Sequence, residues 1–407
     1  MKSSLGGQVF LFEPGRTRRF SVAFGENLVI LVSCPRKHCL AGDQDFSGFH
    51  QETRTGQAQM RTLSDKENFL RAIEFRRPEW VPIVFELLGV AEKHGPALGE
   101  LMLRHPLIFD AERARRAGAV KPSAEPPGER RFTDDWGCEW LEVQRGIIGQ
   151  VVGHPLANWS ALDDLRIADP EKQRDWEAVR KNAEEQRARG ELVNGYMDVI
   201  QGGFFDRLQF LRGLDNLLVD LLDRPPELDE LIRIVLEYNM KLIRLWLDAG
   251  ANVLHFHGDI GMQNSLMMSP EIFREVLKPA YRKMFQTCRR EGVHVKYSSD
   301  GNLLEIVDDL VECGVSYHDP QVRACTIDGI AQAYNGKLCA MVDIDEQMLP
   351  FCTPQDIDNQ VREIFRRIGT PQGGLMLFAC VTTDVPLENI DAVCTTWERH
   401  TAAQVRR

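Results

Sequence analysis

The feature that most restricts the fold of this chain is an alternation of strand-like and helix-like segments that runs from Trp80 to the C-terminal end. Short apolar runs typical of buried strands are followed by segments whose apolar residues recur at helical spacing. The apolar runs lie at 80–88, 193–200, 251–257, 293–298, 315–319, 338–344 and 374–381. This alternation predicts parallel strands that are joined by right-handed helical crossovers.

Parallel strands of this kind form either an open, doubly wound sheet or a closed barrel. No glycine-rich phosphate loop follows the first strand-like run at 80–88, and the number of repeating units favours a barrel. We therefore expect an α/β fold, a distorted (β/α)8 TIM barrel with N-terminal helical elements and an insertion after the first strand. Residues 90–190 are more polar, and we expect a helical insertion there that carries the element DDWGCEW (134–140).

The N-terminal region differs in composition from the rest of the chain. It is rich in Gly, Arg, Ser and Gln, and Met60 then opens a stretch in which Ser64 is suited to cap a helix. We expect residues 1–59 to be a disordered extension or the product of a start codon assigned too early. A short accessory hairpin is the alternative for this extension. Residues 60–407 are expected to form the barrel domain.

The composition restricts where the protein works and what it binds. The net charge is −11 and the isoelectric point about 5.5, which argues against nucleic acid and anionic membranes as partners. Ten cysteines without a close CxxC pair indicate a reduced, cytoplasmic protein. No apolar run reaches the roughly 20 residues of a membrane helix. The run LVSC (31–34) resembles a lipoprotein cleavage box, but Glu26 and Asn27 interrupt the apolar stretch that a signal peptide needs.

The stretch VLHFHGDIGMQN (253–264) places two imidazoles and a carboxylate at the end of a strand. Side chains alternate between the two faces of a strand, so His255, His257 and Asp259 point the same way. A His-x-His pair on one face suits a metal, although interior histidines bonded to neighbouring strands are at least as common. We interpret His255, the deeper residue, as such an interior histidine, and we predict that Asp259 and His257 are catalytic.

Catalytic groups of parallel barrels lie at the carboxyl ends of the strands. Carboxylates, amides, imidazoles and a thiol follow at least five of the predicted strands, and we expect them to meet at one mouth. We predict that Asp300 is catalytic. The predicted substrate-binding residues are Glu86, Asp198, Gln201, Gln263, Lys296, Ser298, His318 and Gln321. A single aspartate after a strand more often caps a helix, which is the alternative for Asp343 and Asp345. Lys296 could pair with Asp259 or Asp300, or form a Schiff base.

Several stretches of the chain carry a resemblance to a known family. They are FLRAIEFRRPEWVPI, GDIGMQNSLMMSPEIFREVLKPAYRKM, SSDGNLLEIVDDLVECGV, VDIDEQMLPFCTPQDI and TTDVPLENIDAV. From about Met60 to the C-terminus, the chain resembles the uroporphyrinogen decarboxylase superfamily, which also contains cobalamin- and corrinoid-dependent methyltransferases. The resemblance implies a distorted (β/α)8 barrel with one of two chemistries, decarboxylation of a porphyrinogen or methyl transfer.

The expected substrate site departs from the decarboxylase. That enzyme, by resemblance, holds a substrate with eight carboxylates by arginines near the first strand and by a late histidine. Here Glu86 lies in the first strand, and LFACV near the final strand has no histidine. An acid-rich mouth would repel such a polyanion. Lys296, Arg207 and Arg323 would have to supply the positive charge that a decarboxylase needs.

The methyltransferase branch implies a zinc site made by a His-x-Cys stretch and by a cysteine near the final strand. Cys380 matches that last cysteine, whereas the His-x-Cys stretch aligns with residues 298–300, Ser-Ser-Asp. The resemblance then points to a mixed set of carboxylate and thiolate ligands, as in the methoxy-aromatic demethylases. The predicted zinc ligands are Cys380, Asp300, His257 and Glu86. Cys339 lies early in its strand and is interpreted as a core residue.

The expected function is therefore transfer of a methyl group from a small methylated or methoxylated compound to a corrinoid, which a separate protein carries. Decarboxylation of uroporphyrinogen or a related acid in porphyrin biosynthesis is the alternative. Further alternatives are a metal-dependent hydrolase that uses the His-x-His pair and a barrel that binds a tetrapyrrole or corrinoid without catalysis. A homodimer is compatible with the sequence, which does not require one.

Overall fold

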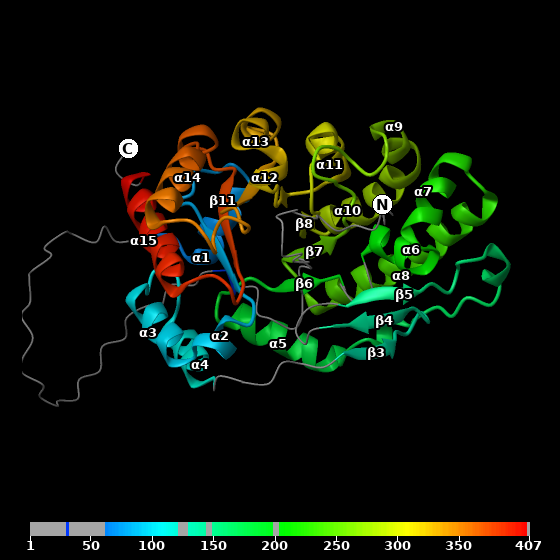
Figure 1. Cartoon of the computed structure of the whole chain (residues 1–407), viewed down its shortest axis with the longest axis horizontal. Coiled ribbons are helices and arrows are strands. Elements are labelled where there is room, and N and C mark those ends of the chain that lie inside the picture. Colours follow the sequence, from blue (N-terminus) through cyan, green and yellow to red (C-terminus); the bar gives the residue numbers. More distant parts are fainter. Residues whose placement is uncertain (1–29, 32–61, 121–128, 144–148, 198–202, 405–407) are drawn as a thin grey trace, which may run out of the picture.

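The main sheet contains seven parallel strands and one antiparallel strand at its edge (Figure 1). The computed structural model describes residues 30–31, 62–120, 129–143, 149–197 and 203–404. The strand order is β1-β2-β11-β10-β9-β8-β7-β6, and β1 is antiparallel to β2. The strands are β1 Ile30–Leu31, β2 Ile83–Leu87, β6 Asn194–Tyr196, β7 Val253–His257, β8 His294–Ser298, β9 Tyr317–His318, β10 Cys339–Asp343 and β11 Leu375–Val381. The predicted parallel strands and helical crossovers are confirmed.

The parallel sheet is curled, and β2 and β6 stand at its two ends. β2 pairs with β11, which brings the first and last parallel strands together as in a barrel. Within the described residues, β2 and β6 are not paired, and seven parallel strands are present. The structure is therefore consistent with a distorted barrel, whereas the predicted count of eight repeats is not reached in the described part of the chain. The insertion separates β2 from β6 along the chain.

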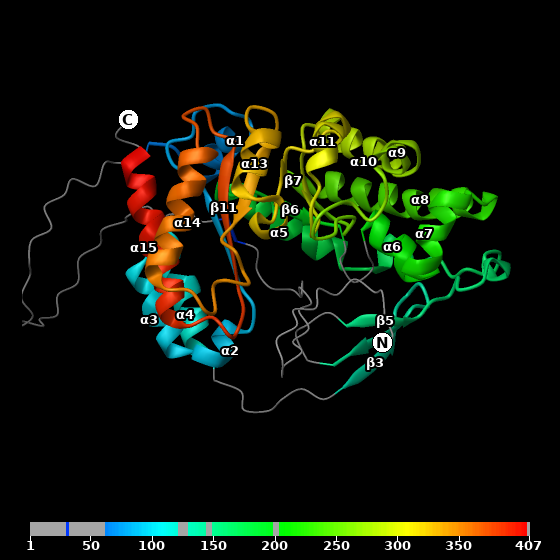
Figure 2. The same ribbon diagram turned by 45° about the horizontal axis from the view of Figure 1, so that its top comes forward.

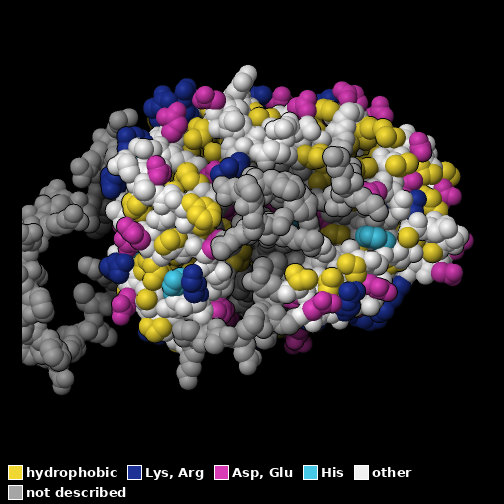
Figure 3. Space-filling model, in the orientation of Figure 1, with side chains coloured by type: hydrophobic (Ala, Val, Ile, Leu, Met, Phe, Trp, Pro, Cys, Tyr) yellow, Lys and Arg dark blue, Asp and Glu magenta, His cyan; other side chains and the backbone are white. Residues whose placement is uncertain are grey.

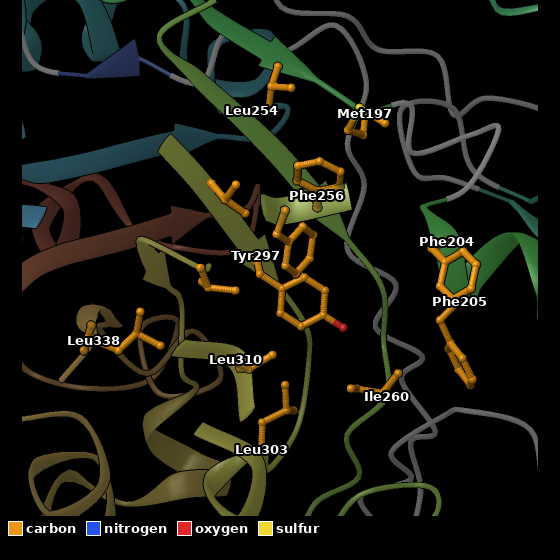
Figure 4. Close-up of a cluster of buried hydrophobic side chains, with 14 of the residues drawn as sticks. Met197, Phe204, Phe205, Leu254, Phe256, Ile260, Tyr297, Leu303, Leu310 and Leu338 are labelled. Carbon is orange, nitrogen blue, oxygen red and sulfur yellow. The ribbon is translucent and has the colours of Figure 1, made fainter. Parts of the chain in front are cut away.

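The two faces of the curled sheet bury two separate cores. The inner core is enclosed by the strands, and α1 closes it with Phe69 and Ile73. Its buried members are Phe69, Ile73, Val84, Leu192, Val253, Tyr317, Cys339, Met341, Met376, Phe378 and Cys380. The larger core lies between the sheet and the helices, and Figure 4 shows part of it around Phe256 and Tyr297. Because Val253 belongs to the inner core, His255 and His257 on the same strand face point inward as well.

The helices begin where local sequence signals predict them. Ser64 caps α1, Ser269 precedes Pro270 of α9, and Thr353 forms a capping box with Asp356 at the start of α14. The helices after the insertion are α6 Phe204–Arg212, α7 Leu214–Asp223, α8 Pro226–Ala249, α9 Pro270–Ile272, α10 Lys278–Arg290, α11 Val307–Cys313, α12 Val322–Cys325, α13 Ile327–Tyr334, α14 Pro354–Arg367 and α15 Leu387–Gln404. Helix α1 spans Asp65–Ile73. The buried faces of the helices after the insertion cover the outside of the sheet (Figure 1).

The insertion differs from the predicted helical one because it also contains a small antiparallel sheet. Its helices are α2 Val90–His94, α3 Pro96–Arg104, α4 Ala111–Ala119 and α5 Trp176–Ala188. Its strands are β3 Arg130–Thr133, β4 Glu139–Glu142 and β5 Gln150–Gly153, paired in the order β3-β4-β5. The element DDWGCEW forms the turn between β3 and β4, and this sheet lies beside α6 in both views (Figures 1 and 2).

A buried ion pair fixes this turn to α6. Asp134 lies 2.9 Å from Arg207, and the two side chains are 1% and 0% exposed. Asp134 also accepts hydrogen bonds from the backbone N–H groups of Trp136 and Cys138 and from the indole N–H of Trp140. The insertion therefore holds α6 in place, and α6 contributes Asp206 to the site described below.

The N-terminal extension predicted for residues 1–59 lies outside the described residues except for strand β1, so its predicted disorder stays a prediction. Among the described residues, no helix is long and apolar enough to cross a membrane. On the face that Figure 3 shows, the visible Lys and Arg side chains are interspersed with Asp and Glu.

Candidate active site

A pocket that opens to the solvent lies at the carboxyl ends of the parallel strands. The residues that line it are His257, Ser298, Ser299, Asp300, Asp319, Gln321, Asp343, Glu346, Phe378 and Cys380. Five of these residues were predicted from the sequence, namely His257, Ser298, Asp300, Gln321 and Cys380. Strands β7, β8, β10 and β11 each end at this pocket, so the predicted mouth is present.

His257, the last residue of β7, is held between two carboxylates. Its Nδ1 lies 2.9 Å from Oδ2 of Asp206, and its Nε2 lies 3.6 Å from Oδ1 of Asp259. Burial by itself lowers the pKa of His257, but Asp259 and Asp206 outweigh it and raise that pKa to about 10. His257 is therefore an imidazolium at neutral pH, oriented by α6.

Asp300 lies in the loop after β8 and is tied to the same group of residues. Its backbone N–H donates to Oδ1 of Asp259 at 2.8 Å, and its own Oδ1 accepts from Nε2 of Gln321 at 2.8 Å. Burial, and then the negative charge of Asp259, raise the pKa of Asp300 to about 7. Asp259 and Asp300, both predicted to be catalytic, therefore lie side by side and share one electrostatic environment.

Lys296 is paired with Asp319 in the barrel interior. Its Nζ lies 3.0 Å from Oδ2 of Asp319, which also accepts a hydrogen bond from Ser298 at 2.8 Å. The ion pair predicted as one alternative for Lys296 is thus present, with Asp319 instead of Asp259 or Asp300. Glu86 on β2 is 4% exposed, and burial raises its pKa. Within the described residues its Oε1 has no hydrogen-bond partner.

Two further carboxyl groups, the buried Asp343 and the half-buried Glu346, line the pocket together with the buried thiol of Cys380. Burial, and then Asp345, raise the pKa of Asp343 to about 7. Burial, followed by Asp343 and Asp300, raises the pKa of Glu346 well above its usual value. Burial and the negative charges of Glu346 and Glu86 raise the pKa of Cys380, so its thiol is protonated in this arrangement.

The predicted zinc ligands do not form a preassembled metal site. Among the described residues, no three His, Cys, Asp or Glu side chains are arranged so that they could hold a metal ion. Both ring nitrogens of His257 face carboxylates, and Glu86 is the register partner of Cys380 on the neighbouring strand β11. The set Cys380, Asp300, His257 and Glu86 therefore does not fit a metal without rearrangement, and zinc stays a prediction.

Several predicted residues lie away from the pocket. His318 points outward to Tyr334 of α13, whose hydroxyl is 2.8 Å from its Nδ1, because strand alternation places Tyr317 inward instead. Gln263 is exposed and donates to the backbone carbonyl of Arg323. The predicted substrate-binding role of these two side chains is not supported by their positions. Asp198 and Gln201 fall outside the described residues.

The interior histidine was predicted correctly. Nε2 of His255 lies 3.0 Å from Oδ1 of Asn194 on the neighbouring strand β6. Burial keeps the pKa of His255 well below its usual value, so the ring is neutral. Cys339 likewise belongs to the inner core.

Comparison with known proteins identifies the family. The family model for uroporphyrinogen decarboxylase (URO-D) matches residues 139–400, which is well over half of the chain. The chain belongs to the uroporphyrinogen decarboxylase family. The match covers strands β6 to β11 and all of the residues that line the pocket, and it begins after β2 and Glu86. A search of the curated proteins finds no match.

Solved structures support the fold of this URO-D family member. A methyltransferase from Methanosarcina mazei is 16% identical in sequence, covers 82% of this chain and 98% of its own, and superimposes with a TM-score of 0.56. A B12-independent methionine synthase from Shewanella sp. W3-18-1 is 8% identical, covers 68% of this chain and 74% of its own, and gives a TM-score of 0.33. The first similarity supports the fold, and the second is too weak to support an argument.

The cations that a URO-D decarboxylase reaction would need are engaged elsewhere. Arg207 is buried in the ion pair with Asp134, and Arg323 lies 2.8 Å from Asp345. Lys296 is neutralised by Asp319. The structure therefore offers no reason to favour the decarboxylase alternative.

Asp206, Glu346 and Phe378 are pocket or pocket-supporting residues that the sequence reasoning missed. Asp206 lies in α6, so no strand end points to it. Glu346 follows β10 by three residues, in VDIDE, and could have been included among the strand ends. Phe378 reads as an ordinary core residue of β11, yet it lines the pocket two residues before Cys380.

Proposed function

We propose that this URO-D family member is a methyltransferase that moves a methyl group from a small methylated compound to a corrinoid carried by a separate protein. The observation that carries the proposal is the charge of the pocket. Four carboxyl groups line it, and neither Lys nor Arg is among the described residues that line it. A porphyrinogen with many carboxylates would face these acids, and the cost of burying unpaired like charges is several kcal/mol. A small neutral or cationic methyl donor avoids this cost.

The chain's own residues would bind and orient the donor. Ser298 and Gln321 are neutral hydrogen-bonding groups on the pocket wall. His257, charged and held by Asp206, would position the donor or move a proton together with Asp259. In the reaction, the bond between the methyl carbon and its heteroatom breaks, and the heteroatom keeps the electron pair. The reduced corrinoid substrate supplies the pair for the new bond to the methyl carbon.

The proposal predicts methyl transfer by the purified protein. Incubated with chemically reduced cobalamin and a library of methylated and methoxylated compounds, the protein should form methylcobalamin from at least one donor, measured by absorbance. Asp300→Asn should slow this transfer by about 100-fold, because it removes an acidic group that lines the pocket beside Asp259. Failure to transfer from every donor would contradict the proposal. Formation of coproporphyrinogen from uroporphyrinogen would favour the decarboxylase instead.

The zinc prediction needs a separate measurement. If the predicted ligands rearrange around zinc, elemental analysis should find one zinc per chain in the purified protein and none in Cys380→Ala. Cys339→Ala is the matched control, because Cys339 lies in the inner core and should leave the zinc content unchanged. Equal metal content in the protein and in Cys380→Ala would contradict a thiolate site.

A further inference from the structure

We infer that the methyl donor of this pocket is a methylated ammonium ion, in which a positively charged nitrogen carries the methyl group. This inference rests on the proposed methyl transfer and names the substrate class for it. It is carried by an excess of carboxyl groups in the pocket wall, by one buried carboxyl oxygen without a hydrogen-bond partner among the described residues, and by an aromatic ring in the pocket wall.

The pocket has more acidic groups than cations to balance them. Asp300, Asp319, Asp343 and Glu346 line it. The nearby cations are already engaged, since His257 lies between Asp206 and Asp259, and Lys296 pairs with Asp319. Asp300, Asp343 and Glu346 form no ion pair among the described residues. An added cation would therefore meet several carboxyl groups that no cation among the described residues neutralises.

Glu86 gives an independent indication of a missing positive or hydrogen-bond-donating group. It is 4% exposed, and within the described residues its Oε1 has no hydrogen-bond partner. Glu86 pairs in register with Cys380 of β11, and register partners on parallel strands point to the same face. Because Cys380 lines the pocket, the unpartnered oxygen of Glu86 is directed toward the same interior.

Phe378 supplies the aromatic component of a cation site. It lines the pocket, and Nζ of Lys296 lies 5.8 Å from its ring centroid, so a cation is already accommodated near this ring. Carboxylates together with an aromatic face are the groups that recognise quaternary ammonium ligands in proteins. A neutral methyl ether would gain neither interaction.

The charge change of the reaction also suits an acidic pocket. When the carbon–nitrogen bond of a methylated ammonium breaks, nitrogen keeps the electron pair and leaves as a neutral amine. The corrinoid substrate, supplied in reduced form by its carrier protein, gives two electrons to the bond with the methyl carbon and is oxidised by two electrons. The amine product loses the charge that held the donor, so the pocket releases it more readily.

Binding measurements on the full chain test the inference without any methyl transfer. By calorimetry, choline should bind at least tenfold more tightly than 3,3-dimethylbutan-1-ol, which has the same shape without the charge. Glu346→Gln and Phe378→Leu should each weaken choline binding by about tenfold and leave the neutral compound unaffected. Glu112→Gln removes an exposed carboxylate on α4 and is the matched control with unchanged binding. If one pocket variant fails to fold, the other variant and the comparison of choline with its neutral counterpart still test the inference.

The outcomes separate this inference from the proposed function. Equal binding of choline and its neutral counterpart, or loss of preference in the surface control alone, would overturn the inference. Transfer from methoxy compounds without any selective choline binding would also overturn it, while methyl transfer itself would stand. Selective choline binding without transfer from any donor would support the cation pocket and contradict the methyltransferase proposal.

Discussion

Replacing Asp134 by alanine should lower the free energy of unfolding by about 3–5 kcal/mol. The substitution leaves Arg207 charged and fully buried without its carboxylate, and it removes the acceptor for two backbone N–H groups and one indole. Such groups cannot recover water at this depth, so the full desolvation cost remains. Chemical denaturation followed by fluorescence would measure the change.

The neighbouring Asp135 provides a matched control for this prediction. Its side chain is 54% exposed, and its nearest cation, Arg166, lies 3.9 Å away. Asp135→Ala should change the free energy of unfolding by less than about 1 kcal/mol. A similar loss in both variants would show that the turn, and not the buried pair, accounts for the effect.

Replacing Lys296 by methionine should have an effect of similar size, and one that depends on pH. Lys296 is 4% exposed, pairs with Asp319, and its positive charge counteracts the rise that burial causes in the pKa of Glu86. Without it, ionised carboxyl groups are buried unpaired, which costs about 3–5 kcal/mol at pH 8.

The direction of the pH dependence follows from the raised pKa of Glu86. The pKa of the Glu86 carboxyl is higher in the folded state than in the unfolded state. Below the unfolded pKa, both states are protonated and the carboxyl group does not lower the free energy of unfolding. As the pH rises above that value, the unfolded state loses its proton more easily, and the fold is destabilised. Lys296→Met should therefore lose less stability at pH 5 than at pH 8. Adding Asp319→Asn should recover much of the loss at pH 8, and equal losses at the two pH values would contradict the ion-pair explanation. Thermal and denaturant unfolding at both pH values would measure this.

Much of the fold could be predicted because its signals are local. The capping box of Thr353 and Asp356 and the Ser269–Pro270 start depend on residues close in sequence. The strands of the main sheet are apolar runs that can be recognised from the sequence without knowing which strand each one pairs with. The β3–β5 sheet was not predicted, because β3 is largely exposed and its pairing with β4 depends on the burial of Trp136 and Trp140 against α6.

The site could be predicted where it follows from strand alternation. His257, Ser298, Asp300 and Cys380 were found because residues at the carboxyl ends of parallel strands meet at one edge of the sheet. His318 was predicted to face the pocket. Side chains alternate along β9, so Tyr317 points inward and His318 points toward α13. Asp206 was missed because it reaches the site from a helix.

The sequence by itself determined that this chain forms parallel strands with acidic groups, imidazoles and a thiol at their carboxyl ends. Periodicity and turn signals act over a few residues, so they can be read along the chain. Only the tertiary structure decided which charges are paired, such as Lys296 with Asp319 and His257 with Asp206, and which carboxyl groups have no cation. Pairing depends on distances of a few ångströms and on burial, and both are set by how the curled sheet brings remote strands together.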